Sequence, residues 1–313
     1  MAQQNKIIPL VFSVDDNYAA CMAVTLKSLL LNASKDYFYK IYVLNTGLSQ
    51  PVKDKLKEFE NGEYFSVEYV NVEKRLSLFG DKLHLRDYYT NTTYYRFFIP
   101  TLFPQYDKVL YLDADLVVLD DISKMFNTEL GDNLIGAIPE EVMQLVKVFG
   151  DYVEEGLDVE CSKYFNADIA LFNTKALREL NVEQKFVDLL QKFTFEVTQD
   201  QDYLNVICKG RVVYLDLGWN KAPLPNPNFD EKDLKIIHFK LYDKPWYYKD
   251  VMYEEYFWEY AKKTAFYQDL LKTREEYYTP ERVEKDKIAY QNLEQLARDY
   301  VKSPNRYKLF AKK

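Results

Sequence analysis

The sequence is poor in the features that mark several common nucleotide- and metal-binding folds. It holds only nine glycines, and neither GxGxxG nor GxxxxGK[ST] occurs, so a dinucleotide-binding turn and a P-loop are both unsupported. Its three cysteines are scattered without a CxxC pair, which argues against a disulfide framework or a zinc site and favours a reducing compartment. No run approaches the roughly 18 apolar residues of a membrane span, and residues 1–12 are too short a stretch for a signal peptide. We therefore expect a cytoplasmic protein.

Charge excludes another class of function. The 313 residues carry a net charge of −8, so nucleic acid is not an expected partner. The basic residues of the last fifteen positions outnumber Asp299, the single acidic one; they are Lys302, Arg306, Lys308, Lys312 and Lys313. Such a tail either is simply solvated or makes peripheral contact with an anionic membrane, which would place the protein at the inner face of that membrane.

The order of predicted elements indicates an α/β fold. Apolar, strand-like runs at residues 7–14, 39–45 and 65–72 alternate with helical patterns, the first of them at 19–31, where Asp16 or Asn17 is a candidate N-cap. This rhythm predicts a mostly parallel mixed sheet flanked by helices. We expect one α/β domain over residues 1–250, followed by a helical C-terminal extension over residues 251–313.

Two carboxylates at the end of a buried strand are the first candidate site. Residues 109–112 form a short apolar run that ends in Asp113 and Asp115, with only Ala114 between them. In an extended chain, residues two apart point to the same face, so the carboxylates can converge. Such a pair is expensive to bury without a partner, and oxygen ligands suit Mg²⁺ or Mn²⁺. The pattern predicts a metal–diphosphate site.

Other polar residues lie near the predicted ends of later elements. Asn166-Ala167-Asp168 stands at the entrance to an expected strand at 169–172, and His238 ends another at 235–239. A lone histidine at a strand end is more often structural than a ligand. The cluster at 198–202 precedes a predicted helix, which Thr198 could cap. The long loop predicted at 73–92 is typical of a lid or binding loop, and we assign no role to its His84.

Taken together, six short blocks resemble the family 8 glycosyltransferases, the retaining group that includes bacterial lipopolysaccharide galactosyltransferases and glycogenin. The blocks are Phe-Ser-Val-Asp-Asp-Asn-Tyr (12–18), Tyr-Tyr-Arg (94–96), Leu-Asp-Ala-Asp (112–115), Phe-Asn-Ala-Asp (165–168), Asp-Gln-Asp (200–202), and His238 followed by Lys244-Pro245-Trp246. The resemblance runs from residue 11 to residue 246. It implies a GT-A fold, in which a Rossmann-like nucleotide half and an acceptor half share one mixed sheet.

The resemblance also implies a metal and a set of ligands. Asp113, Asp115 and His238 match the family's Mn²⁺ ligands, with Mg²⁺ as a possible substitute, since an imidazole favours Mn²⁺. Lys244 matches the lysine on the diphosphate. The residues that match the rest of the nucleotide-sugar site are Ser13, Asp15, Asn17, Tyr18, Arg96, Ala114, Asn166, Ala167, Asp200 and Gln201. Of these, the catalytic candidates are Gln201, Asp200, Asn166 and Arg96.

The implied reaction moves a hexose from a UDP-sugar, most readily UDP-glucose or UDP-galactose, to a glycan or glycoconjugate acceptor. An amide such as Gln201 is a weak nucleophile, which favours front-side displacement over a covalent intermediate; Asp168 or Asp200 would be the alternative nucleophile. Two residues depart from the family pattern. Leu241 stands where relatives often have glycine, so Lys240 could supply a phosphate contact instead. Glu140 replaces an aspartate and is expected to face the acceptor or Arg96.

Two other classes of function stay open at this point. A non-catalytic relative could bind glycans or nucleotide sugars through the same residues. A haloacid-dehalogenase phosphatase also begins its site with strand-Asp-x-Asp, but that motif normally lies near the N-terminus, and no downstream lysine with paired aspartates is evident here.

Overall fold

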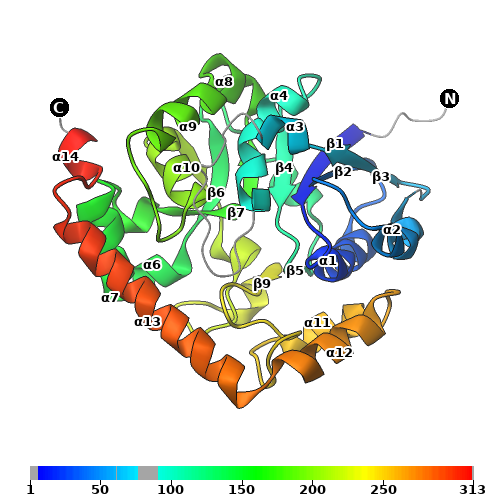
Figure 1. Ribbon diagram of the computed structural model, residues 1–313. Helices are drawn as coiled ribbons and strands as arrows, with labels where there is room; N and C mark the ends of the chain where they lie inside the picture. The colour runs from blue at the N-terminus through cyan, green and yellow to red at the C-terminus, as the bar shows by residue number, and fades with distance from the viewer. Residues whose placement is uncertain (1–5, 61, 77–90, 312–313) are drawn as a thin grey trace.

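The computed structural model describes residues 6–60, 62–76 and 91–311 (Figure 1). Most of the loop predicted at 73–92, including His84, lies outside these residues. A seven-stranded sheet in the order β3-β2-β1-β4-β7-β6-β8 forms the centre. Its strands are β1 (Lys6–Ser13), β2 (Tyr37–Asn45), β3 (Phe65–Asn71), β4 (Val109–Leu112), β6 (Ile135–Pro139), β7 (Phe165–Phe172) and β8 (Val212–Tyr214). Only β7 runs antiparallel to its neighbours, which confirms the predicted mostly parallel mixed sheet.

The central strands of the sheet are buried on both faces because they are apolar on both sides, whereas the edge strands β3 and β8 are only partly buried. In β1, Leu10 and Phe12 enter one hydrophobic core and Val11 enters the other. The long helix α1 (Ala19–Asn32) covers the first face, as Figure 1 shows, and its apolar residues join that core. Elements that contribute to the second core are η3 (Asn91–Phe98), α4 (Ile99–Leu102), α8 (Thr174–Glu179), α9 (Val182–Leu190) and α10 (Asp200–Cys208). Continuous apolar strands of this kind are typical of sheets covered on both faces.

A separate two-stranded ribbon carries the chain away from the carboxyl end of β4. The strands β5 (Leu116–Val118) and β9 (Ile236–His238) pair antiparallel, with Leu116 opposite His238. The Thr25 hydroxyl of α1 lies 2.7 Å from the Ala114 carbonyl oxygen and accepts a hydrogen bond from the Leu116 amide. The ribbon therefore brings His238 beside the two aspartates that follow β4, although more than a hundred residues separate them in sequence.

The chain ends in four helices, α11 (Glu254–Ala261), α12 (Tyr267–Tyr277), α13 (Pro280–Lys302) and α14 (Lys308–Ala311). Phe257 of α11 and Leu270 of α12 are buried in the first core, and Leu293 and Ala297 of α13 in the second. Figure 1 shows α13 running along the outside of the molecule from α12 towards α14. Where it passes the π-helical turn η4 (Tyr152–Gly156), a Cβ on Gly156 would lie 2.9 Å from the Tyr300 ring, so this position needs a glycine. The division at residue 250 stays a prediction.

Several local predictions were wrong. The N-cap position of α1 is Tyr18 and carries no side-chain cap, because Asp15 accepts the backbone N–H groups of Asn17 and Tyr18, and Asp16 accepts that of Ser49. Thr198 does not cap α10 either, since the N-cap position is Gln199, at a φ of 52°.

Three element boundaries also differ from the sequence-based expectation. The helical pattern of residues 93–103 predicts a helix that carries Arg96, but the structure has the 3₁₀ segment η3 there, followed by a single α-helical turn. The helical pattern of residues 175–193 predicts one helix after β7, but the chain forms α8 and α9, divided at Asn181, whose φ is 56°. β7 begins at Phe165, so Asn166 and Asp168 lie within the strand and not before it.

The remaining short elements connect the larger ones. They are α2 (Gln50–Leu56), η1 (Lys57–Phe59), α3 (Glu73–Leu76), α5 (Ser123–Phe126), α6 (Glu141–Leu145), α7 (Lys147–Asp151), η5 (Cys161–Lys163), η6 (Leu217–Asn220) and η7 (Glu231–Asp233). Across the part of the chain that the structure describes, we find no helix with the length and apolar character needed to cross a bilayer.

Candidate active site

A cavity opens where β1 and β4 end, the edge at which α/β sheets bind ligands. Its volume, counted out to the open mouth, is about 1190 Å³. The polar residues that line it are Ser13, Tyr18, Thr92, Thr93, Arg96, Tyr111, Asp113, Asp115, Glu140, Asn166, Asp168, Thr198, Gln201, His238, Lys240, Tyr242 and Lys244. Four of these are carboxylates and three are lysine or arginine, so the lining carries a small negative excess.

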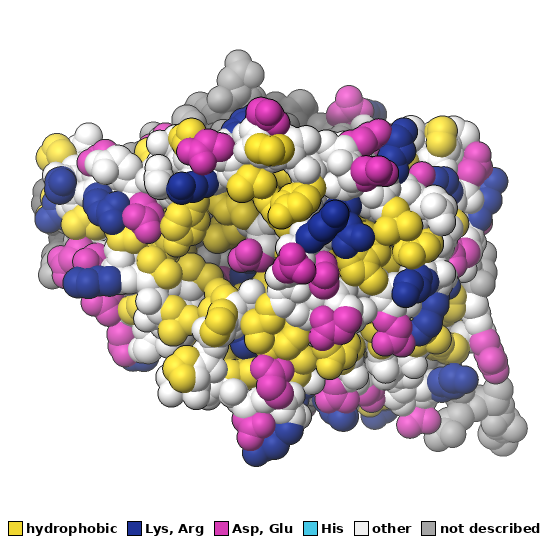
Figure 2. Space-filling model, turned by 90° about the horizontal axis from the view of Figure 1, so that it is seen from below, with side chains coloured by type: hydrophobic (Ala, Val, Ile, Leu, Met, Phe, Trp, Pro, Cys, Tyr) yellow, Lys and Arg dark blue, Asp and Glu magenta, His cyan; other side chains and the backbone are white. Residues whose placement is uncertain are grey.

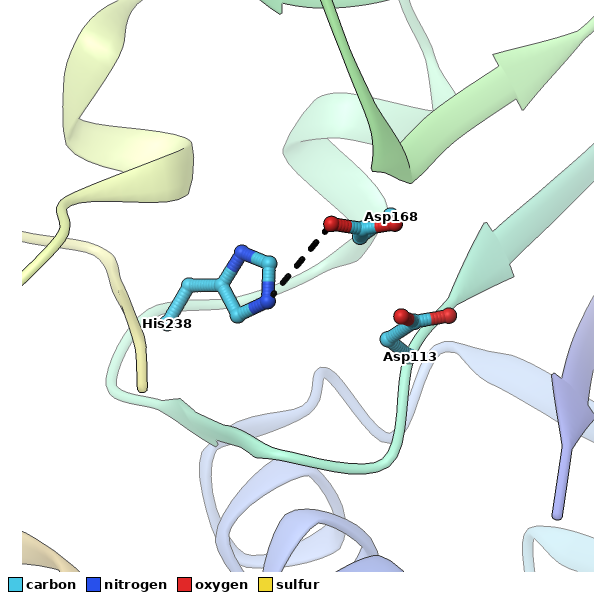
Figure 3. Close-up of side chains that lie close together, drawn as sticks. All are labelled: Asp113, Asp168 and His238. Atoms are coloured by element: carbon cyan, nitrogen blue, oxygen red, sulfur yellow. Dashed lines mark ion pairs between the residues drawn. The ribbon is translucent and has the colours of Figure 1, made fainter. Parts of the chain in front are cut away.

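Three groups in this cavity lie close enough to share one cation. One ligand atom each from Asp113, Asp168 and His238 falls within 4.8 Å of the other two, and Figure 3 shows the three side chains converging from β4, β7 and the end of β9. Burial and the neighbouring Asp168 carboxylate raise the pKa of Asp113 well above its ordinary value. A cation between the carboxylates would remove this repulsion. The arrangement therefore fits a divalent metal ion.

Asn220, which was not predicted as a site residue from the sequence, fixes the orientation of the His238 imidazole. Asn220, fully buried, places its Oδ1 2.9 Å from Nδ1 of His238, so a proton on Nδ1 is donated to it and Nε2 is left as a lone-pair donor. That Nε2 lies 3.3 Å from Oδ1 of Asp115 and 3.8 Å from Oδ2 of Asp168. The imidazole is thus oriented as a metal ligand between two carboxylates. Nothing local in the sequence marks Asn220 as part of the site.

Asp115 has a cationic partner of its own. The Lys244 ammonium lies 2.6 Å from Oδ2 of Asp115 and also donates to the Phe239 carbonyl. Burial raises the pKa of Asp115, but Lys244 and His238 outweigh it and hold that pKa well below its usual range. The same ammonium lies over the rings of Tyr18 and Trp246, at 5.6 and 5.1 Å. Lys244 therefore stands between the Asp115 carboxylate and the rings of Tyr18 and Trp246.

Arg96 lies in the wall of the cavity, in the middle of a group of carboxylates. Its guanidinium, only 1% exposed, pairs with Asp168 at 3.0 Å, Asp200 at 3.0 Å and Asp113 at 3.4 Å. It also lies 4.6 Å from the centre of the Tyr111 ring, whose hydroxyl donates to Asp113 at 2.6 Å. A single buried cation therefore holds three carboxylates in place, which explains why the 3₁₀ segment η3 faces the cavity.

Asp200 lies behind this wall and does not line the cavity. The Thr93 hydroxyl donates to its Oδ1, and Arg96 pairs with its Oδ2. Burial raises the pKa of Asp200 to about 7, with Arg96 opposing and Asp168 adding to the shift. A group in this position can hold Arg96 and change its charge near neutral pH.

Gln201 and Asn166 form a fixed amide pair in the cavity wall. Oε1 of Gln201 accepts from the Ala167 N–H and from Nδ2 of Asn166, both at 3.0 Å. Nδ2 of Asn166 lies 2.9 Å from Asp168 as well. Ala167 contributes its backbone and not its side chain, which is buried away from the cavity. The pair is rigid because each of these polar atoms has a protein partner.

The block predicted to hold the nucleoside divides into two groups. Ser13, Tyr18 and Ala114 line the cavity, and Tyr18 stands edge-on to Trp246 with ring centres 6.5 Å apart. Asp15 and Asn17 do not line it, because Asp15 is turned towards the backbone N–H groups that precede α1. Tyr18 therefore offers a ring at the cavity, while Asp15 shapes the turn that presents it.

The two departures from the family pattern lie side by side. Glu140 pairs with Lys240 at 2.9 Å and accepts from Nδ2 of Asn166, and no pairing with Arg96 is seen among the described residues. It lines the cavity, so the alternative that it faces the acceptor stays a prediction. Lys240 is only 9% exposed and engaged by this carboxylate. Leu241, which stands in the place of a glycine, has a φ of 51°, a backbone conformation that leucine adopts at a cost. The backbone at this position therefore adopts a conformation typical of glycine, although the residue is leucine.

The remaining wall of the cavity is apolar and was not foreseen. It is formed by Val142, Met143, Phe149, Val197, Leu241 and Leu293. Figure 2 shows one face of the molecule on which hydrophobic side chains surround a hollow, with acidic side chains along its rim. One half of the cavity thus suits ions and phosphates, and the other suits a ring or an apolar surface.

Comparison with known proteins agrees with this architecture. The chain is 25% identical over 264 residues to general stress protein A of Bacillus subtilis (strain 168), which covers 78% of this chain and 89% of that protein. It is 26% identical over 259 residues to the lipopolysaccharide 1,2-glucosyltransferase of Escherichia coli (strain K12), covering 78% and 74%.

Among solved structures, the galactosyltransferase LgtC in complex with donor and acceptor sugar analogues superposes with a TM-score of 0.66 at 26% identity, covering 82% of this chain and 96% of that one. The bifunctional glycosyltransferase WbbM in its apo form gives 0.72 at 27% identity, over 88% of this chain but only 52% of that one. Fold and site thus define a transferase of the GT-A class. The family model for glycosyl transferase family 8 matches residues 9–250, so the chain belongs to that family. Membership removes the phosphatase alternative.

Proposed function

We propose that this enzyme transfers a hexose from a UDP-sugar to a glycan or glycoconjugate with retention of anomeric configuration, and that UDP-glucose or UDP-galactose is the donor. The observation that carries the proposal is the convergence of Asp113, Asp168 and His238 in one cavity with Lys244 and Tyr18. These groups supply, side by side, a cation site, a phosphate partner and an aromatic ring for a base.

The metal in this proposal is Mn²⁺, with Mg²⁺ as a substitute. Asp113, Asp168 and His238 would hold it, and Asp115, the other ligand implied by the family resemblance, lies 3.3 Å from the imidazole Nε2. When bound, the ion would act as a Lewis acid on the diphosphate oxygens. Asn220 orients the imidazole for this task, and a set of carboxylates with one imidazole is chemistry that suits Mn²⁺.

Binding of the nucleotide engages the remaining polar residues. We propose that Tyr18 stacks on uracil, that Ser13 and Ala114 border the ribose, and that Asp15 and Asn17 act by shaping their turn. Lys244, now on Asp115, would turn its ammonium to the β-phosphate, where negative charge grows as the sugar leaves.

Front-side displacement fits the catalytic groups better than a covalent intermediate. Asp200 is buried behind Arg96, and Asp168 is held by Arg96 and Asn166, so neither carboxylate is free to attack the sugar. In the proposed step the bond from the anomeric carbon to the β-phosphate oxygen breaks, the acceptor hydroxyl bonds to that carbon from the same face, and its proton passes to the leaving phosphate. Gln201 would border this face, and Arg96 would keep the carboxylates in position.

Other parts of the proposal concern the whole protein. We propose a catalytic domain over residues 1–250 with the helical segment 251–313 as an extension, a cytoplasmic location, and contact of the basic tail with an anionic membrane. Within that tail, Lys308 pairs with Glu155 at 3.0 Å, so it is already engaged with the protein. Lys312 and Lys313 lie outside the described residues. Nucleic acid is not a proposed partner.

The main alternative, a non-catalytic binding relative, is separated by measuring release of UDP. The protein would be incubated with UDP-glucose, UDP-galactose or UDP-N-acetylglucosamine, each with and without Mn²⁺. We expect metal-dependent release from one hexose above the others, and a fall of about 100-fold or more in Asp113→Asn. Asp132→Asn, an exposed carboxylate on another surface, is the matched control and should keep full activity. If no donor yields UDP with either metal, the non-catalytic alternative holds.

A further inference from the structure

The helix α13 contributes to the active-site cavity although it lies beyond residue 250, where the family match ends. Leu293 of α13 lines the cavity directly. Tyr290, one turn earlier on the same helix, meets Phe149 at 6.1 Å and Tyr242 at 6.4 Å between ring centres, and both of these partners line the cavity too. The apolar wall of the cavity is therefore built partly by a segment that the family match does not include.

A second cleft adjoins the cavity on the other side of Tyr242. It is open to solvent, encloses about 930 Å³ when counted out to its open mouth, and runs between α13 and the loop that follows β9. The lining residues are Tyr242, Asp243, Tyr248 and, from α13, Val283, Asp286, Lys287, Tyr290, Gln291 and Glu294. Because Tyr242 lines both spaces, a chain-like ligand could extend from the cavity into this cleft without leaving the protein surface.

The cleft is fixed in shape by one buried carboxylate. Asp286, 7% exposed, accepts hydrogen bonds from the hydroxyls of Tyr248 and Tyr277 and so ties the loop and α12 to α13. Because both hydroxyls that donate to Asp286 belong to the protein, Asp286 is a positioning residue. This carboxylate holds Tyr248, and the rings of Tyr242 and Tyr290 lie against each other beside it in the same cleft.

The chemistry of this lining selects one kind of ligand. Aromatic rings bordered by carboxylates and an amide suit the apolar faces and the hydroxyl groups of sugars. Asp243, Asp286 and Glu294 outnumber the single cation Lys287, so an acceptor that carries phosphates or carboxylates would be repelled. From this cleft we infer that the acceptor is a neutral oligosaccharide, with its terminal sugar in the cavity and its preceding sugars on the tyrosines of α13 and the adjoining loop. This inference rests on the proposed function.

Binding as a function of chain length tests the inference. The probes are malto-, cello-, galacto- and chito-oligosaccharides of increasing length from the monosaccharide, with oligogalacturonates as an anionic series, titrated calorimetrically into the full-length protein saturated with UDP and Mn²⁺. In at least one neutral series we expect affinity to rise about tenfold or more as sugars are added beyond the first. Tyr290→Ala should abolish that rise and leave binding of UDP, in the other half of the cavity, unchanged.

Two further variants distinguish an effect on the cleft from a disturbance of the protein core. Gln291→Trp changes an exposed cleft residue and should fill the cleft without disturbing the core, so it should also abolish the rise. Ile288→Ala removes a side chain on the same helix that is 47% exposed and outside the cleft, and should keep the rise. The inference is overturned if no neutral series gains affinity with length, if the gain survives in Gln291→Trp, or if only oligogalacturonates show it. Failure of UDP itself to bind would instead overturn the proposed function.

Discussion

At the scale of single residues, Asp200 gives a pH dependence whose sign can be stated. Burial raises its pKa to about 7, whereas an aspartate in the unfolded chain titrates near 4. Between these values the folded protein holds a proton that the unfolded chain has released, so stability falls as the pH rises from about 4 to about 7 and then levels off. From pH 5 to pH 8 this amounts to about 2–3 kcal/mol.

The variant Asp200→Asn has no titrating group at this position, so its stability should lack the fall between pH 5 and pH 8 that Asp200 causes. Urea unfolding of both proteins, without metal, at a series of pH values would show the wild type losing about 2–3 kcal/mol more than the variant between pH 5 and pH 8. Parallel curves for the two proteins would mean that Asp200 is ionised throughout this range, which would contradict the raised pKa.

Leu241 provides a second prediction, on backbone strain. Its φ of 51° is accessible to glycine without strain but is unfavourable for leucine and worse for a β-branched residue. We expect Leu241→Gly to be more stable than Leu241→Val by about 1 kcal/mol or more in urea unfolding. Equal stabilities would mean that the loop relaxes out of this conformation.

The residues of the site were predictable to the extent that short motifs mark them. Asp113, Asp115, His238 and Lys244 meet in the cavity as the blocks of sequence suggested. Asp168 was considered only as a nucleophile, yet it completes the group of three that can share a cation. Asn220 was missed, because a second residue behind a ligand is recruited by the fold and has no spacing of its own to reveal it.

At the scale of elements, strands were easier to predict than the ends of helices. The apolar runs of β1, β2 and β3 pair in parallel, and the continuous apolar character of β1 indicated a strand buried on both faces, whereas β3 is only partly buried. The start of β7 was missed because Phe165 pairs with Pro139 of β6, a contact that depends on the sheet and not on local pattern. Asn181 in the left-handed region likewise divided a helix whose periodicity continued through it.

The attachment of α13 gives a prediction at this scale. Asp286→Ala removes a buried acceptor of two tyrosine hydroxyls, so the free energy of unfolding should fall by about 2 kcal/mol. Hydrogen exchange should quicken in the first half of α13 and in the loop around Tyr248. Asp299→Ala, an exposed carboxylate near the end of the same helix, is the control and should change neither quantity appreciably. Unchanged exchange in Asp286→Ala would show that this carboxylate does not anchor the helix.

At the scale of the whole molecule, one sheet with a core on each face places every charged group of the site at a single edge. The nucleotide block at the end of β1, the carboxylates after β4 and the histidine of β9 come from distant parts of the sequence, and only the strand order makes them neighbours. The family resemblance implied a GT-A fold with one mixed sheet, but neither it nor composition and periodicity predicted the strand order, the antiparallel β7 or the ribbon that carries His238. The C-terminal helices were predicted, but their contribution to the cavity was not.

The most direct test of the central claim is the thermal stability of the protein with UDP and Mn²⁺, separately and together, in the wild type and in Asp115→Ala. A ligand that binds only the folded state adds about 2.7 kcal/mol at 100 times its dissociation constant. We predict that UDP and Mn²⁺ together stabilise the wild type well beyond the sum of their separate effects and that this excess is lost in the variant. If no combination shifts the wild-type melting temperature, the cavity is not a metal–UDP site and the proposed function is wrong.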